Sequence, residues 1–366
     1  MNPVKVLHLR SGTRLFGPER VILSLGRCAA PDFQIIVGGM GRGKPGLLLE
    51  EAAALGLETF WLECRRRLDF AAIRRLAEFL RARDIRLLHA HDFKANFYAL
   101  AARRYQPMLM VATLHLWNRS SAVTSAYEIF DALQVRFFDQ VIAVSPEIAE
   151  QARRWRIPAE KVRVILNGVD MARFKACSQC FRNERIVIGS VGRLTRQKGY
   201  HDFLRAAAKV SQACPRARFL LVGDGPQRGA LEAEAEQLGI SHLVTFAGQR
   251  DPVEASYAEM DLFVSSSLSE GLPVAVLEAM ASSLPVVATA VGASGEVIEN
   301  EKSGLLVPPA NVDALASALL RLVNTPDEAM TLAAAGRERV ARHFSAEKMT
   351  RETESVYGEL LHGKED

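Results

Sequence analysis

The chain has 366 residues, of which 49% are hydrophobic and 24% charged, and its formal net charge is +4. This length allows two domains of ordinary size, and the composition excludes disordered and fibrous classes. No uncharged apolar run reaches the roughly 18 residues of a spanning helix, and the amino terminus does not read as a signal peptide, so we expect a cytoplasmic location.

The charge is distributed unevenly along the chain. Residues 1–180 carry 27 Lys and Arg against 17 Asp and Glu, whereas the remaining residues carry 19 against 25. A basic first half and an acidic second half indicate different partners. Anionic lipid headgroups, a lipid pyrophosphate and nucleic acid are the candidates for the basic half.

Short apolar segments alternate with helical patterns along the first half of the chain. Apolar residues at helical spacing predict helices at 20–30 and 70–84, and Ser145 is a plausible cap for a third helix at 146–156. Such alternation is typical of a parallel sheet covered by helices on both faces. The expected strands are 4–9, 34–37, 58–62, 86–91, 108–116, 140–144 and 162–166.

The predicted helix 70–84 is rich in arginine. Arg74, Arg75, Arg81 and Arg83 lie largely away from its apolar face, and Arg65–Arg67 precede it. A solvated helix surface is the first interpretation. The second is a peripheral contact with the inner face of an anionic membrane, where each basic residue adds about 1 kcal/mol.

Polar residues follow several predicted strands, at the sheet edge where α/β folds bind ligands. His91 and Asp92 close one strand and His115 closes the next, and a histidine in such a place can titrate near neutral pH. Asp92 is a candidate for positioning an acceptor hydroxyl. The loop with Gly17, between the first strand and the first helix, is a usual place for backbone to approach a phosphate. Satisfied structural histidines and a plain turn are the alternatives.

The alternation breaks at 176–185, which we interpret as the linker between a first domain, 1–175, and a second, 186–344. Cys177 and Cys180 lie in it. Five scattered cysteines do not suggest a disulfide framework, and no second pair follows at zinc-site spacing. The pair is therefore interpreted as ordinary linker residues.

The second half begins with a strand at 186–191, and further strands are expected at 219–222, 244–247, 262–264 and from Pro285. Arg193 and Lys198 bracket the turn after the first of these. Two cations with backbone amides can hold a pyrophosphate, although surface charge on a loop has the same appearance.

Residues 261–309 read as strand, Ser-rich loop, helix and strand. Pro273 suits the first position of the helix, whose unpaired N–H groups are available to an anionic or hydroxyl-rich ligand. Glu270 precedes the helix, and Glu278 lies within its apolar sequence VAVLEAMA. A carboxylate in that setting requires a partner.

The spacing of Glu270 and Glu278 closely resembles the Glu-x7-Glu signature of family 4 glycosyltransferases. The resemblance extends over nearly the whole chain and implies the GT-B fold, an α/β architecture of two Rossmann-like doubly wound domains that face each other across a cleft. It also implies that 345–366 forms a helix returning to the first domain. Ser266, Ser283 and Ala293 depart from the family pattern, which usually has proline, glycine and glycine there.

The resemblance assigns roles to individual residues. Glu270 and His115 are implied as catalytic residues near the transferred sugar. The other implied contacts are Arg193, Lys198 and Gly17 to the donor diphosphate; Gly271, Leu272 and Glu278 to the donor sugar and ribose; Gly223, Gly225 and Arg250 near the nucleotide base; and His91 and Asp92 to the acceptor.

The resemblance implies a hexosyl-type transferase that moves a sugar from a nucleoside diphosphate to an acceptor with retention of anomeric configuration. The acceptor is expected to be a glycan or lipid-linked glycan of the cell envelope. No metal is expected, because two cations stand where Mg²⁺ acts in other transferases. No other cofactor and no nucleic-acid partner are expected. A sugar-nucleotide epimerase and a non-catalytic nucleotide-sugar-binding protein are the alternatives. A nicotinamide dehydrogenase is disfavoured because no strand is followed by GxGxxG with an acid about 20 residues on.

Overall fold

The computed structural model describes residues 3–12, 15–66, 68–115, 122–177, 180, 181 and 184–363, with only the backbone for 122–128. Arg67 and Leu116, which belong to segments singled out above, lie outside these ranges. The chain forms two compact units, one of residues 1–168 with 346–366 and one of residues 169–345. The predicted linker 176–185 therefore lies inside the second unit rather than between the two.

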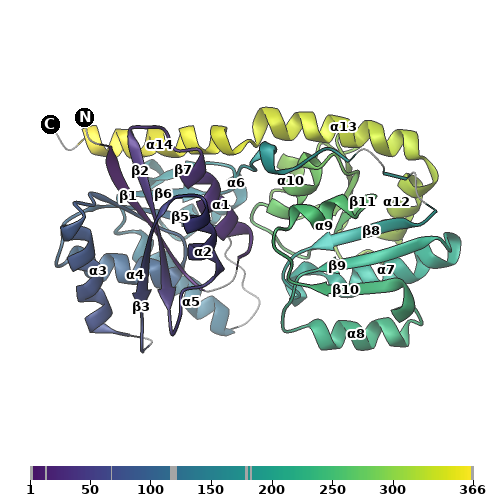
Figure 1. The fold of residues 1–366 in the computed structure, drawn as a ribbon, viewed down its shortest axis with the longest axis horizontal. Coiled ribbons are helices and arrows are strands. Elements are labelled where there is room, and N and C mark those ends of the chain that lie inside the picture. Colours follow the sequence, from purple (N-terminus) through teal and green to yellow (C-terminus); the bar gives the residue numbers. More distant parts are fainter. Residues whose placement is uncertain are drawn as a thin grey trace. The chain divides into compact units, whose positions relative to one another are not determined.

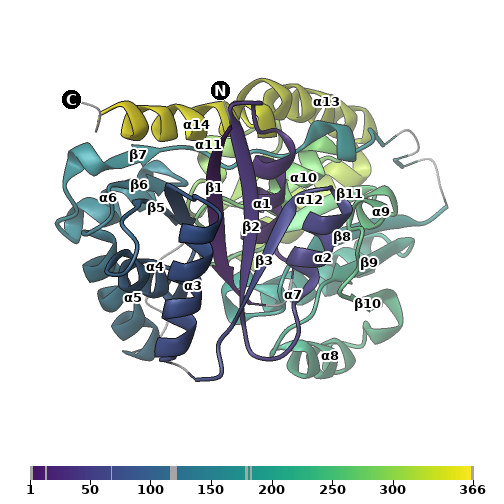
Figure 2. The ribbon, with the colours of Figure 1, turned by 60° about the vertical axis from the view of Figure 1, so that its left-hand side comes forward.

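The first unit is built on a seven-stranded sheet in the order β3-β2-β1-β4-β5-β6-β7, with all neighbours parallel. Figure 2 shows its strands from β1 to β3 side by side. The order places β1 and β4 at the centre, where all of β4 and the middle of β1 are buried. The strands are β1 Val4–Ser11, β2 Phe33–Gly41, β3 Glu58–Glu63, β4 Leu87–Ala90, β5 Leu109–Leu114, β6 Gln140–Ala143 and β7 Val162–Val164.

Helices cover this sheet, and their ends follow local capping chemistry. The side chains of Asp69, Asp92 and Ser145 accept hydrogen bonds from backbone N–H groups in the first turns of α3, α4 and α6. These bonds satisfy donors that a helix cannot pair internally. The cap predicted at Ser145 is confirmed. The helices are α1 Gly17–Arg27, α2 Leu47–Ala54, α3 Phe70–Ala82, α4 Phe93–Arg103, α5 Ala122–Val135, α6 Pro146–Arg154 and α14 Ala346–His362.

The carboxyl-terminal helix α14 belongs to the first unit and contacts α1. Its Tyr357 is 1% exposed, and Glu354 accepts a hydrogen bond of 2.8 Å from the backbone N–H of Ala30. Burial raises the pKa of Glu354, so that contact is made by a carboxyl group of weakened acidity. The predicted return of this segment to the first unit is confirmed.

The arginines of α3 are used largely within the first unit. Arg75 donates to the carbonyl of Glu63, Arg81 to Gln106 and to the carbonyl of Tyr105, and Arg83 to Glu58. The interpretation of a helix surface with local roles is therefore favoured over a membrane-binding face.

The second unit contains a six-stranded sheet in the order β10-β9-β8-β11-β12-β13. Figure 1 labels its strands β8, β9, β10 and β11. All of its strand pairs are parallel. As in the first sheet, the order reverses beside the first strand of the unit, and this reversal point is where open α/β sheets bind ligands. The strands are β8 Ile186–Val191, β9 Ala217–Val222, β10 Val244–Gly248, β11 Leu262–Ser265, β12 Val286–Thr289 and β13 Leu305–Val307.

Among the helices of the second unit, α7 contacts α8 and α12, and α13 contacts α10 and α12. Phe203, Phe219 and Leu319 are fully or nearly fully buried in the core between α7, α12 and the sheet. The helices are α7 Tyr200–Ala213, α8 Arg228–Gln237, α9 Glu254–Ala258, α10 Val274–Ala281, α11 Ser294–Val297, α12 Val312–Asn324 and α13 Pro326–His343. No helix in the described part of the chain is long and apolar enough to span a membrane.

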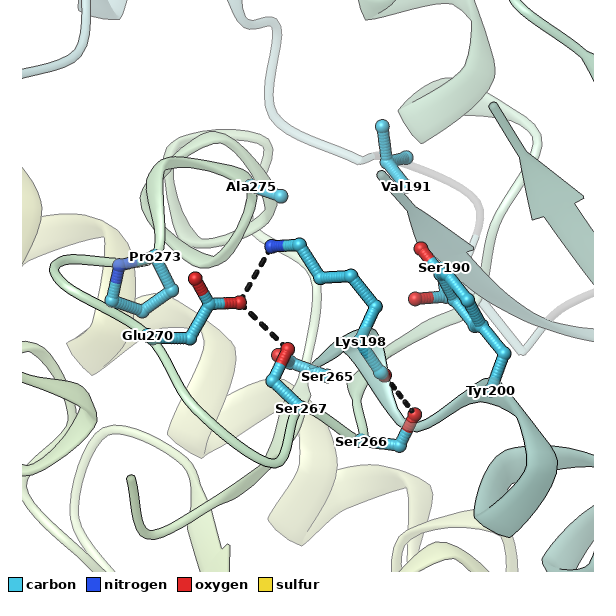
Figure 3. Close-up of a pocket in the computed structure, with 10 residues that line it drawn as sticks. All are labelled: Ser190, Val191, Lys198, Tyr200, Ser265, Ser266, Ser267, Glu270, Pro273 and Ala275. Atoms are coloured by element: carbon cyan, nitrogen blue, oxygen red, sulfur yellow. Dashed lines mark hydrogen bonds and ion pairs between the residues drawn. The ribbon is translucent and has the colours of Figure 1, made fainter. Parts of the chain in front are cut away.

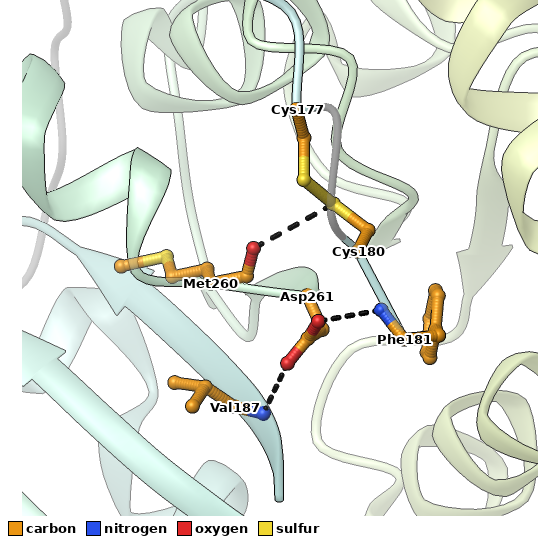
Figure 4. Close-up of a disulfide and its surroundings, with 6 residues drawn as sticks. All are labelled: Cys177, Cys180, Phe181, Val187, Met260 and Asp261. Atoms are coloured by element: carbon orange, nitrogen blue, oxygen red, sulfur yellow. Dashed lines mark hydrogen bonds between the residues drawn. A yellow bond between two sulfur atoms is a disulfide. The ribbon is translucent and has the colours of Figure 1, made fainter. Parts of the chain in front are cut away.

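The cysteine prediction was wrong, because Cys177 and Cys180 form a disulfide (Figure 4). The surrounding segment is tied to the second unit by the backbone N–H of Cys177, which donates to Ser282, and that of Phe181, which donates to Asp261. The other carboxylate oxygen of Asp261 accepts from Val187 at the start of β8. The spacing CxxC alone does not distinguish a bonded pair from two thiols. The anchoring of the segment by Asp261 and Ser282, which are distant in sequence, could not be read from the local pattern.

Near α10, the structure differs from one prediction and explains one departure from the family pattern. Pro273 was predicted at the first helical position, but it is the N-cap, with ψ of 93°, and the helix begins at Val274. Ser283 follows the helix with φ of +55°, which explains why glycine is usual there in the family.

Replacing Ser283 by glycine should stabilise the second unit. A left-handed conformation costs a residue with a Cβ about 1 kcal/mol, which corresponds to a rise in Tm of about 2–4 °C for a unit of this size. Thermal unfolding of the purified variant measures it. Ser282→Gly is the control, because Ser282 has φ of −81° and its hydroxyl bonds to Glu278, so this change should lower Tm. An unchanged or lower Tm for Ser283→Gly would contradict the strain argument.

Candidate functional site

A small polar pocket lies at the carboxyl edge of the second sheet (Figure 3). It is formed by the ends of β8 and β11, the turn before α7 and the start of α10. Lys198 is the one cation and Glu270 the one carboxylate among its described lining residues. These are Ser190, Val191, Lys198, Tyr200, Ser265, Ser266, Ser267, Glu270, Pro273 and Ala275.

The structure brings the predicted Lys198 and Glu270 together, although they are 72 positions apart. The ammonium Nζ lies 2.5 Å from Glu270 Oε1, and the hydroxyl of Ser267 donates to the same oxygen at 2.6 Å. Glu270 is 8% exposed, so its charge depends on these partners. The pair forms a compact site with one positive and one negative group, both suited to a ligand that carries phosphate and hydroxyl groups.

The loop that carries Lys198 is held in place by residues next to the pocket. Ser266 donates to the carbonyl of Lys198 at 3.0 Å, and Gln197 donates to the carbonyl of Ser269 at 2.8 Å. Ser266, which stands where the family usually has proline, thus supplies a bond that proline cannot form. Gly199 has φ of +62°, and a Cβ there would lie 2.0 Å from the carbonyl oxygen of Ser266.

The loop that carries Glu270 packs against Gly292. A Cβ at Gly292, whose φ is +52°, would lie 2.0 Å from the carbonyl oxygen of Glu270. The next residue, Ala293, donates from its backbone N–H to the carbonyl of Gly271 at 3.0 Å. The close approach needed for the loop is therefore made at Gly292, and the alanine at 293, where the family usually has a second glycine, is accommodated.

Replacing Gly292 by alanine should displace Glu270 and impair the site. The added methyl group meets backbone on Glu270 rather than a movable side chain, so we expect a destabilisation of about 2–3 kcal/mol and loss of ligand binding. Thermal shift with and without nucleotide sugar measures both effects. Gly295→Ala is the matched control, because a Cβ at Gly295 meets no atom within 4 Å. Equal Tm values and equal ligand-induced shifts for the two variants would show that the contact at Gly292 is dispensable.

Glu278 has the partner that its apolar surroundings required. It is 4% exposed, and the hydroxyl of Tyr257 donates to its Oε2 at 2.6 Å. The bond joins α9 to α10 and fixes the orientation of the carboxylate. Gly271 and Leu272 are buried in the loop between Glu270 and α10.

The remaining predicted residues of this unit lie on neighbouring strand ends. Arg193 is exposed on the turn after β8 and is not among the residues that line the pocket. A Cβ at Gly223 or Gly225 would lie 1.9 Å or 2.4 Å from the carbonyl oxygens of Gly192 and Leu194, so both glycines allow two turns to pack together. Arg250 pairs with Glu259 at 2.6 Å. These contacts give the glycines a structural role and leave a ligand role as a prediction.

Sequence analysis did not identify Ser267, Ser190 or Tyr200 as pocket residues. The run Ser265–Ser267 after a strand was a possible signal for the first, whereas nothing in the sequence marks Tyr200. Burial raises the pKa of Tyr200, so its phenol stays neutral and can donate a hydrogen bond.

In the first unit, the predicted residues lie around the end of β1. Asp92 accepts from the backbone N–H of Ser11 at 2.6 Å and caps α4, so its carboxylate already has structural partners. Gly17 is the first residue of α1, beside Glu19, which pairs with Arg10. His91 and His115 follow β4 and β5; His91 is buried and His115 is partly exposed.

Comparison with known proteins places these features in context. Residues 17–173 match the family model described as Glycosyltransferase Family 4, and residues 185–325 match Glycosyl transferases group 1. An uncharacterized glycosyltransferase of Methanocaldococcus jannaschii is 28% identical over 295 residues, or 74% of each chain. The lipopolysaccharide core biosynthesis glycosyltransferase LpsE of Rhizobium meliloti is 30% identical over 231 residues, covering 62% of this chain and 65% of that one.

Solved structures support the fold independently. The Anabaena protein HepE, solved in complex with UDP-glucose, aligns with a TM-score of 0.87 at 21% identity, covering 97% of this chain and 99% of that one. At this identity the likeness establishes the fold alone. The predicted architecture of two Rossmann-like α/β domains of the GT-B type is confirmed.

Proposed function

Since the chain belongs to the glycosyltransferases, with a family 4 domain followed by a group 1 domain, we propose that it transfers a hexose from a nucleoside-diphosphate donor with retention of anomeric configuration. The observation that carries this proposal is the pairing of Lys198 with Glu270 at the sheet edge. A cation and a hydroxyl-accepting carboxylate within 2.5 Å of each other match the two ends of a sugar diphosphate.

The proposed chemistry is electrostatic. As the bond between the sugar and the diphosphate breaks, negative charge accumulates on the leaving phosphate, and Lys198 with Arg193 stabilises it. Donors fixed in advance contribute several kcal/mol to such a step. Backbone N–H groups at the start of α10, and those of the loop at Gly17, are further proposed contacts to the donor.

Glu270 is proposed to orient the hydroxyl groups of the donor sugar. Lys198 and Ser267 both contact its Oε1, which leaves Oε2 as the acceptor for a sugar hydroxyl. A carboxylate stabilised in this way is a poor nucleophile, which supports departure and attack on one face of the sugar without a covalent intermediate. Glu278, held by Tyr257, is proposed to accept from the ribose hydroxyls.

Transfer is proposed to need no metal. The carboxylate in the pocket already has an ammonium partner at 2.5 Å, so a divalent cation would have to displace Lys198 to bind there. The lysine supplies the positive charge that Mg²⁺ provides in other transferases. Gly223, Gly225 and Arg250 remain the proposed region for the nucleotide base.

A lipid-linked glycan of the cell envelope is the proposed acceptor. Ile129, Phe130, Leu133 and Phe137, in α5 and the turn after it, are 45%, 46%, 50% and 64% exposed. Arg103 donates to the carbonyl of Phe137, which places a cation beside this apolar surface. Aromatic and aliphatic side chains flanked by arginine suit an anionic lipid surface.

Flotation with vesicles tests the acceptor proposal. The protein should float with phosphatidylglycerol vesicles and much less with phosphatidylcholine vesicles, and the variant Leu133→Ser/Phe137→Ser should lose most of the binding. Leu238→Ser is the control, because Leu238 is 36% exposed in the second unit. Binding that is equal for all three proteins would contradict a lipid contact at α5.

Turnover of a panel of nucleotide sugars, measured in EDTA, tests the transferase proposal. We expect one donor to be consumed with an added glycan acceptor, and NMR of the product to show the anomeric configuration of the donor. An inverted product would overturn retention, and loss of activity restored by Mg²⁺ would overturn metal independence. Conversion of the donor without an acceptor would indicate an epimerase, and binding without turnover a non-catalytic protein.

A further inference from the structure

Six side chains of the first unit form one continuous chain of hydrogen bonds, which we call the histidine chain. It passes through β1, β4, β5 and α14 and ends at His115. Each buried histidine in it uses both ring nitrogens. The contacts in order are Thr113 Oγ1 to His89 Nε2 (2.6 Å), His89 Nδ1 to Tyr357 Oη (2.6 Å), Tyr357 Oη to His8 Nε2 (3.2 Å), His8 Nδ1 to His91 Nε2 (2.9 Å) and His91 Nδ1 to His115 Nε2 (3.4 Å).

The three internal histidines are neutral in the folded protein. His8, His89 and His91 are 0%, 1% and 2% exposed. Burial lowers the pKa of His8 to about 3 and the pKa values of His89 and His91 well below the usual value. A neutral imidazole carries one hydrogen, so it donates at one nitrogen and accepts at the other.

This stoichiometry couples every contact to the next. If Thr113 donates to His89, then His89 donates to Tyr357. The buried Tyr357 hydroxyl contacts only His89 and His8 among the described residues, so its hydrogen goes to His8, and the donation continues to His115. If His115 donates inward instead, every bond reverses. The histidine chain therefore has two consistent arrangements, and they differ in which nitrogen of each ring carries the hydrogen.

The buried end of the chain selects the direction. Thr113 is 6% exposed, and among the described residues its hydroxyl bonds only to His89. In the reversed arrangement the Thr113 hydrogen would be buried without an acceptor, at a cost of about 1–3 kcal/mol. Thr113 is therefore the donor. All four histidines then carry their hydrogen on Nδ1, and His115 accepts at Nε2.

A metal ion is a poorer occupant of this cluster. Ring nitrogens of His8, His89 and His91 do lie within 4.8 Å of one another. However, the rings of His89 and His91 stack at 4.2 Å with an interplanar angle of 25°, so their in-plane lone pairs do not converge on one point. Binding an ion would also break the contacts to Thr113 and Tyr357, beside the positive charge of Arg10, which donates to the carbonyl of His91.

We propose that Thr113, His89, Tyr357, His8 and His91 are positioning residues that hold His115 as the neutral tautomer with its hydrogen on Nδ1. His115 thus presents an N–H donor, not a basic nitrogen, at the edge of the first sheet. Such a donor can bind a hydroxyl oxygen of a sugar but cannot remove its proton. The tautomer follows from the first unit alone, whereas its use in transfer rests on the proposed function.

Nitrogen-15 NMR of histidine-labelled protein without donor tests the tautomers directly. We expect His8, His89, His91 and His115 to show protonated Nδ1 and unprotonated Nε2, each assigned from a His→Gln variant. Thr113→Val removes the terminal donor, and Tyr357→Phe breaks the chain in the middle. Both should shift His8, His91 and His115 toward a mixture of tautomers, whereas Tyr98→Phe, a buried tyrosine outside the chain, should change none of them.

Activity supplies the second readout. We expect Tyr357→Phe and Thr113→Val to lower kcat about tenfold while the donor KM stays within about twofold, as is usual for outer partners of an active group.

Hydrogen on Nε2 of His115 in the wild-type spectrum would overturn the proposal whatever the transferase assay shows. Unchanged kcat with altered tautomers would overturn the positioning role. Tight zinc binding that abolishes the Nδ1–H signals would assign a metal site instead. A protein with the expected tautomers but no transfer would overturn only the proposed function.

Discussion

Lys198→Ala will abolish most sugar transfer while leaving the second unit folded. Lys198 is the one cation among the described pocket residues, so its loss removes the charge that meets the leaving diphosphate. Removing one preorganised electrostatic contact of this kind costs about 10²–10³ in rate. The stability cost should be smaller than for a fully buried pair, because the lysine side chain is 24% exposed.

Steady-state kinetics and circular dichroism on purified variants measure this effect. Lys209→Ala is the matched control: Lys209 also pairs with a carboxylate, that of Asp313, but both are exposed and distant from the pocket lining. Arg193→Ala is also expected to lose most transfer. Near-normal kcat/KM in Lys198→Ala would refute the diphosphate role, and near-normal kcat/KM in Arg193→Ala would identify that residue as surface charge.

Acid will destabilise the first unit sharply. The unfolded chain protonates His8, His89 and His91 near pH 6.5, but the folded unit, in which burial lowers their pKa values, does not. The contribution of these neutral histidines to the free energy of unfolding is fully present above pH 6.5. It is lost as the pH falls toward the pKa values of the histidines in the folded protein. Each histidine contributes about 1.4 kcal/mol per pH unit in that window, or about 4 kcal/mol for the three.

Denaturant unfolding followed by tryptophan fluorescence reports this loss selectively. Trp61 and Trp155 belong to the first unit, and the third tryptophan, Trp117, lies outside the described residues. Between pH 7.5 and 5.5 the free energy of unfolding should fall steeply. Burial also lowers the pKa of His115, to about 3, so four histidines share the slope and His8→Gln should reduce it by about a quarter. His343→Asn, at an exposed position of the second unit, should not. Constant stability over this range would show that the buried rings are already charged in the folded state.

Local patterns predicted much of the fold because each depends on neighbouring residues. The cap at Ser145 requires only a hydroxyl before a helix. The position of Glu278 in an apolar run predicted a hydrogen-bond partner, because burying a lone charge is costly. Alternating strands and helices likewise specified parallel sheets.

The structural features that the sequence did not predict depend on contacts between residues distant in sequence. His89 and Tyr357 are 268 positions apart, and nothing in either local pattern selects the other. The same holds for the anchoring of the disulfide segment by Asp261. The ion pair of Lys198 with Glu270 also required the tertiary structure, because their sequence positions gave the two residues separate roles rather than a shared bond.

The position of α14 determines when the first unit can be completed during synthesis. Tyr357, at the centre of the histidine chain, is translated only after every residue of the second unit. A nascent chain paused before Ala346 therefore lacks part of the interior of its amino-terminal unit, and a stop codon at that point would leave His8 and His89 without their phenol partner. The interior of the first unit can therefore be completed only after the whole second unit has been synthesised.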